Sequence, residues 1–283
     1  DEDMPIRLSY MGNTFINNHS YQGRLKESTQ LGAELIGDNS IEADAEILAM
    51  TVESMKRAGL KEFQISVGHA EFFKGLAEVA GLSEEQEDEL RELIANKNFF
   101  GVEEVIANLP MEEDLRQLFG LLDGFYDSPE QFAQAKQFAA KYERVAYALE
   151  HLSRLHEVLK SYQVEKYISY EMGAISDYHY YTGIIFAGYT FGSGEPVVKG
   201  GRYDKLLKYF GKDAPSIGFA IALDQLLAAV SRQKTENVEI IPRELILYTE
   251  GKEQEAIHTA KTRREQGAYV ELQKMTAGKA KSD

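Results

Sequence analysis

Three tyrosines and a histidine stand in consecutive positions, 178 to 181, within the stretch "SDYHYYTGIIF". A surface loop has little use for so many large rings. A buried strand would seldom carry so many hydroxyl groups, because each one needs a hydrogen-bond partner once it leaves water. The stretch therefore raises the question of which ligand these rings are arranged to hold.

Gln30 and Glu34 form a second candidate pair. They lie four residues apart in a segment with the character of a β-strand, so their side chains point to the same face. Two interpretations fit this pattern. The pair belongs to a solvent-facing polar row, or its amide and carboxylate hydrogen-bond an amine or an imidazole ring.

The stretch "GGRYDKLL", residues 200–207, is the third candidate. Its two glycines allow a close backbone approach and a left-handed turn, and Asp204 or a neighbour can begin the helix that follows. A structural turn explains the glycines but not Arg202 and Tyr203. We therefore count this pair among the candidate site residues.

Composition excludes several kinds of site. The 283 residues include no cysteine, which rules out disulfides and thiolate metal sites, and none of the six histidines has a partner at a zinc spacing. The sequence has no Walker loop, GxGxxG or GxSxG motif. We therefore predict no metal and no cofactor.

The formal net charge of −15 argues weakly against a nucleic-acid partner. No apolar run approaches the ~18–20 residues that a membrane-spanning helix needs, and no signal peptide is visible. We therefore expect no membrane association and a cytoplasmic location.

The N-terminal third alternates strand and helix patterns. Strands are predicted at 6–12 and 29–37 as an antiparallel hairpin, and another at 63–67. Between them, Ser40 is a candidate N-cap for a helix that ends at Gly59.

Helical patterns dominate residues 70–162, where Ser83 and Ser128 each begin a capping-box motif. We interpret residues 83–160, approximately, as a helical insertion. Strand patterns return at 167–172, 181–189, 196–199 and 216–222, before a helix at 223–231 and a polar connector at 232–244. A strand at 245–249, a helix at 254–266 and a strand at 269–273 complete a short βαβ-like piece.

These elements predict an α+β architecture. The predicted domains are a core at 1–231 and, at 232–283, a linker with an incomplete α/β domain.

The candidate motifs together resemble the catalytic core of histidyl-tRNA synthetase, a class II aminoacyl-tRNA synthetase. They are the "GxxF…GR…QxxxE" pattern from Gly12 to Glu34, "YYTGIIF", "GGRYDKLL", and "PSIGFAIALDQLL" at 215–227. The resemblance covers about residues 5–231 and implies an antiparallel sheet core with helices. We expect the family's dimer-forming first motif to lie outside the given sequence. By motif position, the resemblance implies that four residues line a pocket for free histidine: Gln30, Glu34, Tyr181 and Tyr203.

The same resemblance indicates that histidine is not activated by ATP. The family uses three arginines for that step, and this chain has Ile16, Ser176 and Gln225 in their places, with Asn18 in place of an adenine-side glutamate. Fixed cations stabilise the charge that develops on the α-phosphate, and losing one such donor costs about 10²–10³ in rate. An active enzyme is therefore not expected.

A histidine pocket retained without the residues for activation by ATP is typical of one paralogous family. The chain resembles this family, the regulatory subunits of ATP phosphoribosyltransferase. The sequences of two segments, "ISVGHAEFF" and "YYTGIIFAGYTFGSGEPVVKGGRYDKLLKYFG", are closer to this family. Ile16 departs from it, because its members often keep an arginine at that position. The resemblance implies a non-catalytic subunit that binds a short-form catalytic subunit, with L-histidine as feedback effector. It also implies a homodimer within a hetero-oligomer and no tRNA. Two alternatives remain open: an active histidyl-tRNA synthetase, and a free amino-acid-binding module of the same fold.

Overall fold

The computed structural model describes residues 4–15, 26–175, 180–191, 193, 195–233 and 243–275. The chain divides into two compact units, residues 1–235 and 236–283, which are described separately. In the described part of the chain, no helix is both long and apolar enough to cross a membrane.

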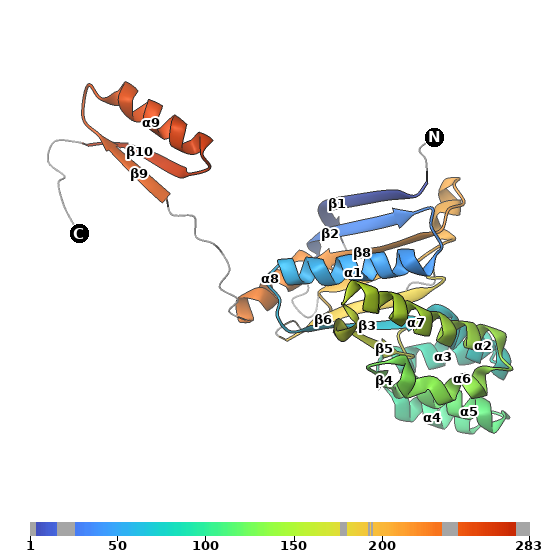
Figure 1. Ribbon diagram of the computed structural model, residues 1–283. Coiled ribbons are helices and arrows are strands. Elements are labelled where there is room, and N and C mark those ends of the chain that lie inside the picture. The colour runs from blue at the N-terminus through green and yellow to red at the C-terminus, as the bar shows by residue number, and fades with distance from the viewer. Residues whose placement is uncertain are drawn as a thin grey trace. The chain divides into compact units, whose positions relative to one another are not determined.

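An eight-stranded, mostly antiparallel sheet forms the centre of the first unit (Figure 1). It begins with the predicted hairpin, in which β1 (Ile6–Phe15) pairs antiparallel with β2 (Glu27–Ile36), so that prediction is confirmed. Among the described strands of this sheet, only β3 and β5 pair in parallel. From the hairpin inwards the order continues with β8 (Ser216–Ala222), β7 (Val198–Arg202), β6 (Ile184–Thr190), β3 (Phe63–His69), β5 (Ile168–Glu171) and β4 (Phe125–Tyr126).

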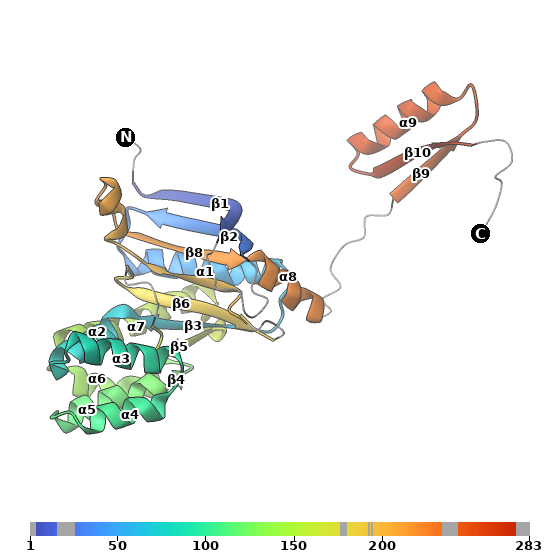
Figure 2. The same ribbon diagram turned by 180° about the vertical axis from the view of Figure 1, so that it is seen from behind.

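Helix α1 (Ile41–Arg57) packs along one face of this sheet, in front of the strands in Figure 1 and behind them in Figure 2. Its predicted ends are confirmed. The Ser40 hydroxyl accepts from the Ala43 amide at 3.2 Å, and Gly59 follows the helix with a φ of +99°. Apolar residues at helical spacing, such as Leu48 and Val52, are fully buried against the sheet and α7 (Glu143–Tyr162). Helix α8 (Leu223–Arg232) packs against β2 and β8.

Short helices fill the segment between β3 and β5. They are α2 (Ala70–Ala80), α3 (Glu84–Ala95), α4 (Phe99–Ala107), α5 (Glu113–Phe119) and α6 (Ala133–Ala139), with single 3₁₀ turns between some of them. The capping box predicted at Ser83 is confirmed. The one predicted at Ser128 is wrong, because a short 3₁₀ turn at Pro129–Phe132 follows Ser128 without a side-chain cap. The Gln131 side chain accepts instead from the Asp127 amide at 2.7 Å.

The second unit has the predicted βαβ order. Strand β9 (Arg243–Tyr248) and strand β10 (Tyr269–Lys274) pair in parallel, and α9 (Glu253–Glu265) connects them.

Candidate functional site

Strand β2 supplies the floor of the candidate site. Gln30, Gly32 and Glu34 alternate along it with residues of the opposite face, among which Ala33 and Leu35 are buried in the apolar core. The period-two alternation of a strand thus sends the apolar side chains toward the helices and leaves the amide and the carboxylate on the other face. Gln30 and Glu34 share a face, as expected from the sequence.

Glu34 is hydrogen-bonded to Tyr203, whose phenol donates to Glu34 Oε2. Tyr203 directly follows β7, and its amide donates to the Ser216 carbonyl at 2.7 Å, which fixes where the ring begins. Gly218 is the cross-strand partner of Glu34, and a side chain there would overlap the Glu34 carboxylate. The strand pairing therefore brings together two predicted residues that lie far apart in the sequence.

The glycines of "GGRYDKLL" act through their lack of a side chain. Gly200 and Gly201 lie inside β7 rather than in a left-handed turn, so that part of the prediction is wrong. A Cβ at position 201 would lie 2.6 Å from the Tyr181 ring, and one at position 200 would overlap the Phe186 ring. The predicted close approach is therefore an approach of aromatic rings to the strand. The helix expected after Asp204 is a 3₁₀ turn at Leu206–Phe210.

Tyrosine rings gather around the Glu34–Tyr203 pair. Tyr180 lies against Tyr181 with ring centroids 4.5 Å apart, and it meets Tyr203 edge to face at 6.0 Å. Tyr10, from β1, extends its ring over Gly32, where a larger residue would collide with it. Sequence reasoning did not select Tyr10 or Tyr180. Tyr180 could have been identified from the sequence because it stands next to Tyr181. Tyr10 could not, because its position over Gly32 depends on the strand register.

Burial changes the acid–base properties of this cluster. It raises the pKa of Glu34 above its ordinary value, although the hydrogen bond from Tyr203 acts in the opposite direction. Burial, and after it the neighbouring Glu34 carboxylate, raises the pKa of Tyr203 far above its ordinary value. The shared proton therefore stays on the phenol at neutral pH, and Glu34 acts as an acceptor.

Gln30 lies toward the other end of the same strand face. Glu34 is four positions farther along the strand, so the two backbone positions are about 13 Å apart. Its cross-strand partner Ala222 is also the N-cap of α8, so Gln225 in the first turn of that helix belongs to this end. Ile16, Asn18 and Ser176, the other positions at which family residues are replaced, lie outside the described residues.

Arg202, the neighbour of Tyr203, is almost fully buried. Its guanidinium contacts Asp44 of α1 at 2.6 and 2.8 Å, and Asp44 also contacts His151 Nε2 of α7 at 2.8 Å. Burial opposes the charge on Arg202, yet Asp44 and Asp204 outweigh it and raise its pKa. This ion pair fastens β7 to the helices, and Arg202 thereby positions Tyr203.

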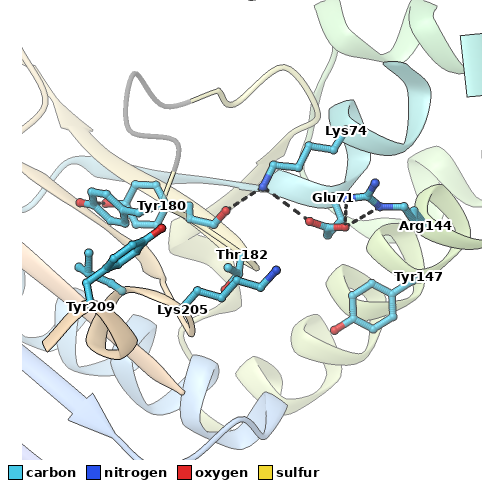
Figure 3. A pocket seen from close by; sticks show the side chains of 10 residues that line it. Glu71, Lys74, Arg144, Tyr147, Tyr180, Thr182, Lys205 and Tyr209 are labelled. Atoms are coloured by element: carbon cyan, nitrogen blue, oxygen red, sulfur yellow. Dashed lines mark hydrogen bonds and ion pairs between the residues drawn. The ribbon is translucent and has the colours of Figure 1, made fainter. Parts of the chain in front are cut away.

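A cavity of about 670 Å³ opens beside Tyr181 (Figure 3). It lies between α2, α7 and the segment that follows β7. Of the four predicted histidine-site residues, only Tyr181 is among its lining residues. The lining consists of Glu71, Lys74, Arg144, Tyr147, Tyr180, Tyr181, Thr182, Lys205, Leu206 and Tyr209.

Across the described residues, no group of three or more histidine, aspartate or glutamate side chains is placed to hold a metal ion. The polar groups of the site are a carboxylate, phenols, amides and ammonium groups. Such groups can bind and orient a small polar ligand through hydrogen bonds.

Comparison with known proteins identifies the family of the chain. The family model described as histidyl-tRNA synthetase matches residues 1–226. The ATP phosphoribosyltransferase regulatory subunit of Acetivibrio thermocellus is 38% identical over 96% of this chain and 65% of its own length. That of Caldanaerobacter subterraneus is 35% identical over 95% of this chain and 70% of its own length. The chain belongs to the family of ATP phosphoribosyltransferase regulatory subunits.

Solved structures extend the comparison to the fold. A Bacillus halodurans structure described as an ATP phosphoribosyltransferase regulatory subunit/histidyl-tRNA synthetase is 32% identical, with a TM-score of 0.82 over 98% of this chain and 70% of its own. Histidyl-tRNA synthetase from Nostoc sp. PCC 7120 is 18% identical, with a TM-score of 0.78 over 99% and 68%, and shares the fold. The predicted α+β fold of the class II synthetase type is thus confirmed. The chain spans about two thirds of the length of the curated relatives named above.

Proposed function

We propose that this chain works as a non-catalytic regulatory subunit of ATP phosphoribosyltransferase in histidine biosynthesis. In this proposal it assembles, as a homodimer within a hetero-oligomer, with a short-form catalytic subunit. Free L-histidine is its effector and inhibits the complex by feedback. The family membership supports the regulatory role, and the site geometry supports the choice of effector. The helices near residues 83–160 would then be an insertion into a synthetase-like core at 1–231, and no tRNA would be bound.

The main support for histidine as the effector is the hydrogen-bonded Glu34–Tyr203 pair. Tyr180, Tyr181 and Tyr10 surround this pair. An imidazole ring is flat and has an N–H donor on its edge. A half-buried carboxylate can accept from that N–H, and aromatic rings can pack against the flat faces. Glu34 has a second carboxylate oxygen for this purpose, because Tyr203 binds Oε2. Gln30, farther along the strand, would contact the amino-acid end of the ligand.

An effector can change activity only if it binds two states of the complex with different affinity. Tyr203 is suited to transmit such a preference, because it is joined to β7 and thereby to the Arg202–Asp44 ion pair and α1. Binding at Tyr203 can therefore bias a packed element rather than a loose side chain.

The neutral residues at the three arginine positions support a role without catalysis. Gln225 can hydrogen-bond but carries no charge, and Ile16 and Ser176 lack charge as well. Histidine-dependent ATP–pyrophosphate exchange by the purified protein tests this directly. We expect no exchange above background under conditions in which an ordinary histidyl-tRNA synthetase is active. Turnover near that of the synthetase would favour the enzyme alternative.

The regulatory role is tested by reconstitution. The chain in its full natural length is mixed with a short-form phosphoribosyltransferase from the same organism, and phosphoribosyl transfer to ATP is measured while histidine is titrated. We expect activity only with both subunits and inhibition by histidine. If the two proteins neither co-purify nor stimulate activity together, a free amino-acid-binding module becomes the better explanation.

A further inference from the structure

We propose that the cavity beside Tyr181 is a second ligand site and that it binds a nucleoside phosphate. The cavity shares Tyr180 and Tyr181 with the proposed histidine site, but Gln30, Glu34 and Tyr203 lie outside its lining. It has about 670 Å³, within the range of ordinary small-molecule sites, and is larger than an amino acid needs. Its side chains combine ammonium and guanidinium groups with phenol rings.

Positive charge gathers in the lining of an otherwise acidic protein. The lining holds Lys74, Arg144 and Lys205 but only one carboxylate, Glu71, whereas the whole chain has a net charge of −15. Glu71 lies 2.6 Å from Arg144, which also pairs with Glu78 outside the lining. Lys205 and the remaining N–H donor of Lys74, which also lies 3.7 Å from Glu71, are therefore available to an anionic ligand.

The ammonium group of Lys74 is placed to bind an anion. Its Nζ donates to the Tyr181 carbonyl at 3.0 Å and lies 3.7 Å from Glu71, while an ammonium group has three N–H donors. Burial lowers its pKa below the ordinary value, although Glu71 opposes the shift. A phosphate oxygen at the remaining donor would replace the hydration that burial has removed.

Lys205 reaches the cavity from the opposite wall (Figure 3). It makes no ion pair or hydrogen bond with another described residue. Its ammonium group can therefore turn toward a ligand phosphate without breaking an existing bond.

Tyrosine rings supply the surface for an aromatic base. Tyr147 of α7 and Tyr209 of the 3₁₀ turn line the cavity together with Tyr180 (Figure 3). Tyr209 is 87% exposed, so the face of its ring is accessible to a ligand in the cavity. A base that stacks on an exposed phenol ring gains free energy whatever its identity.

Gln225, the one replaced ATP-activation position that the structure describes, is not among the residues that line the cavity. Gln225 begins α8 beside the Gln30 end of β2, whereas α2, α7 and residues 205–209 form the cavity. A nucleotide bound in the cavity would therefore be held by residues other than Gln225.

Calorimetric titration of the full-length protein with ATP, adenosine and inorganic tripolyphosphate tests the proposal. We expect ATP to bind at least about tenfold more tightly than either fragment, because one fragment lacks the charge and the other the base. Tripolyphosphate binding as tightly as ATP would reduce the site to an anion site and overturn the nucleotide assignment. Undetectable binding of ATP would overturn the proposal altogether.

Two pairs of exposed residues provide matched variants. Lys205→Ala and Tyr209→Ala should each weaken ATP binding by about tenfold, the usual scale for a charge-assisted hydrogen bond or a stacked base. Lys208→Ala and Phe210→Ala, from the same 3₁₀ turn but outside the lining, should bind ATP like the wild type. Equal ATP affinity in all four variants would place the nucleotide elsewhere. Loss of binding in Gln225→Ala, with Lys205→Ala unaffected, would place it at the old activation site.

Histidine distinguishes this site from the effector site. ATP binding should persist at saturating L-histidine, because the polar groups proposed to bind histidine, on Gln30, Glu34 and Tyr203, lie outside the lining. Displacement of ATP by histidine would mean one shared site and would overturn the assignment. Failure of histidine to bind at all would contradict the proposed effector but leave the result with ATP intact.

Discussion

Arg202 and Tyr203 are neighbours in the chain, yet they belong to two different environments. Arg202 is 4% exposed and binds Asp44, which in turn binds His151. Tyr203 is half-buried and binds Glu34, on the face of the sheet that carries the tyrosines. One residue thus faces a closed polar network and the next an open one.

The difference separates a structural role from a binding role. In the closed network each charge meets opposite charge and hydrogen-bond partners, so removing one member leaves a buried charge unpaired. In the open network, burial makes ionised Glu34 unfavourable, and the described contacts offset this with a single phenol. Groups held in such an unfavourable state are typical of ligand-binding sites.

Asp44→Ala should have the largest effect, on stability. We expect the free energy of unfolding to fall by about 3–5 kcal/mol, because the substitution leaves Arg202 buried without its main partner. Chemical denaturation followed by circular dichroism measures this. The control is Asp204→Ala. The Asp204 carboxylate lies 3.1 Å from Arg202, but the Asp204 side chain is 33% exposed. Asp204 also accepts from the Ser216 amide at 3.2 Å, so its removal should cost about 1–2 kcal/mol, still less than that of Asp44. Equal losses in the two variants would contradict the distinction between a closed and an open network.

Glu34→Gln should mainly affect binding. The affinity for L-histidine should fall by roughly 1.5–3 kcal/mol, the scale of a hydrogen bond to a charged group. Calorimetry compares it with Glu27→Gln, which removes the same charge from an exposed position on the same strand. Unchanged histidine affinity in Glu34→Gln would remove this carboxylate from the effector site.

Tyr203→Phe should have a smaller effect on affinity. Removing the hydroxyl and keeping the ring should weaken histidine binding by about 0.5–1.5 kcal/mol, because one hydrogen bond is lost while ring packing remains. In the reconstituted complex, the histidine concentration for half-inhibition should rise accordingly, without loss of assembly. Normal inhibition by histidine in a folded Tyr203→Phe complex would indicate that the effector acts elsewhere.

The smallest effect concerns pH. Because the pKa of Glu34 is raised in the folded state above its ordinary value of 4.5, the folded protein binds this proton more tightly than the unfolded chain. The stability due to this group is therefore fully present below about pH 4.5 and is lost as the pH rises through the folded pKa. The unfolding free energy of the wild type relative to Glu34→Gln should fall over that range. A difference that grows with pH would show that ionised Glu34 stabilises the fold.

Patterns local in the chain could be predicted from the sequence. The β1–β2 hairpin, the ends of α1 at Ser40 and Gly59, and the βαβ order of the second unit depend on alternation, capping and glycine chemistry within a few residues. The Ser128 capping box failed for a related reason. The motif was present, but the backbone made a 3₁₀ turn and Gln131 found a different amide.

Positions of the candidate site residues were accessible through the resemblance to a synthetase core, but their contacts were not. Nothing in the local sequence pairs Glu34 with Tyr203, which depends on the order β2–β8–β7 and on the glycine opposite Glu34. Tyr10 was overlooked because only the β1–β2 register places it over Gly32. A shift of that register by one residue would turn the ring to the other face.

The sequence by itself determined the residue types of this protein: a carboxylate and phenols without the arginines of activation, an acidic total charge, and the helices and strands that carry them. The tertiary structure alone decided which of these groups meet. It directed Arg202 into a buried ion pair and Tyr203 to Glu34, and it gathered Lys74, Arg144 and Lys205 from three separate elements around one cavity. The physical reason is range. Hydrogen bonding and packing within one turn or strand depend on neighbours in the chain, whereas electrostatic and ring contacts between elements depend on how buried apolar faces fix the strand order and the helix positions.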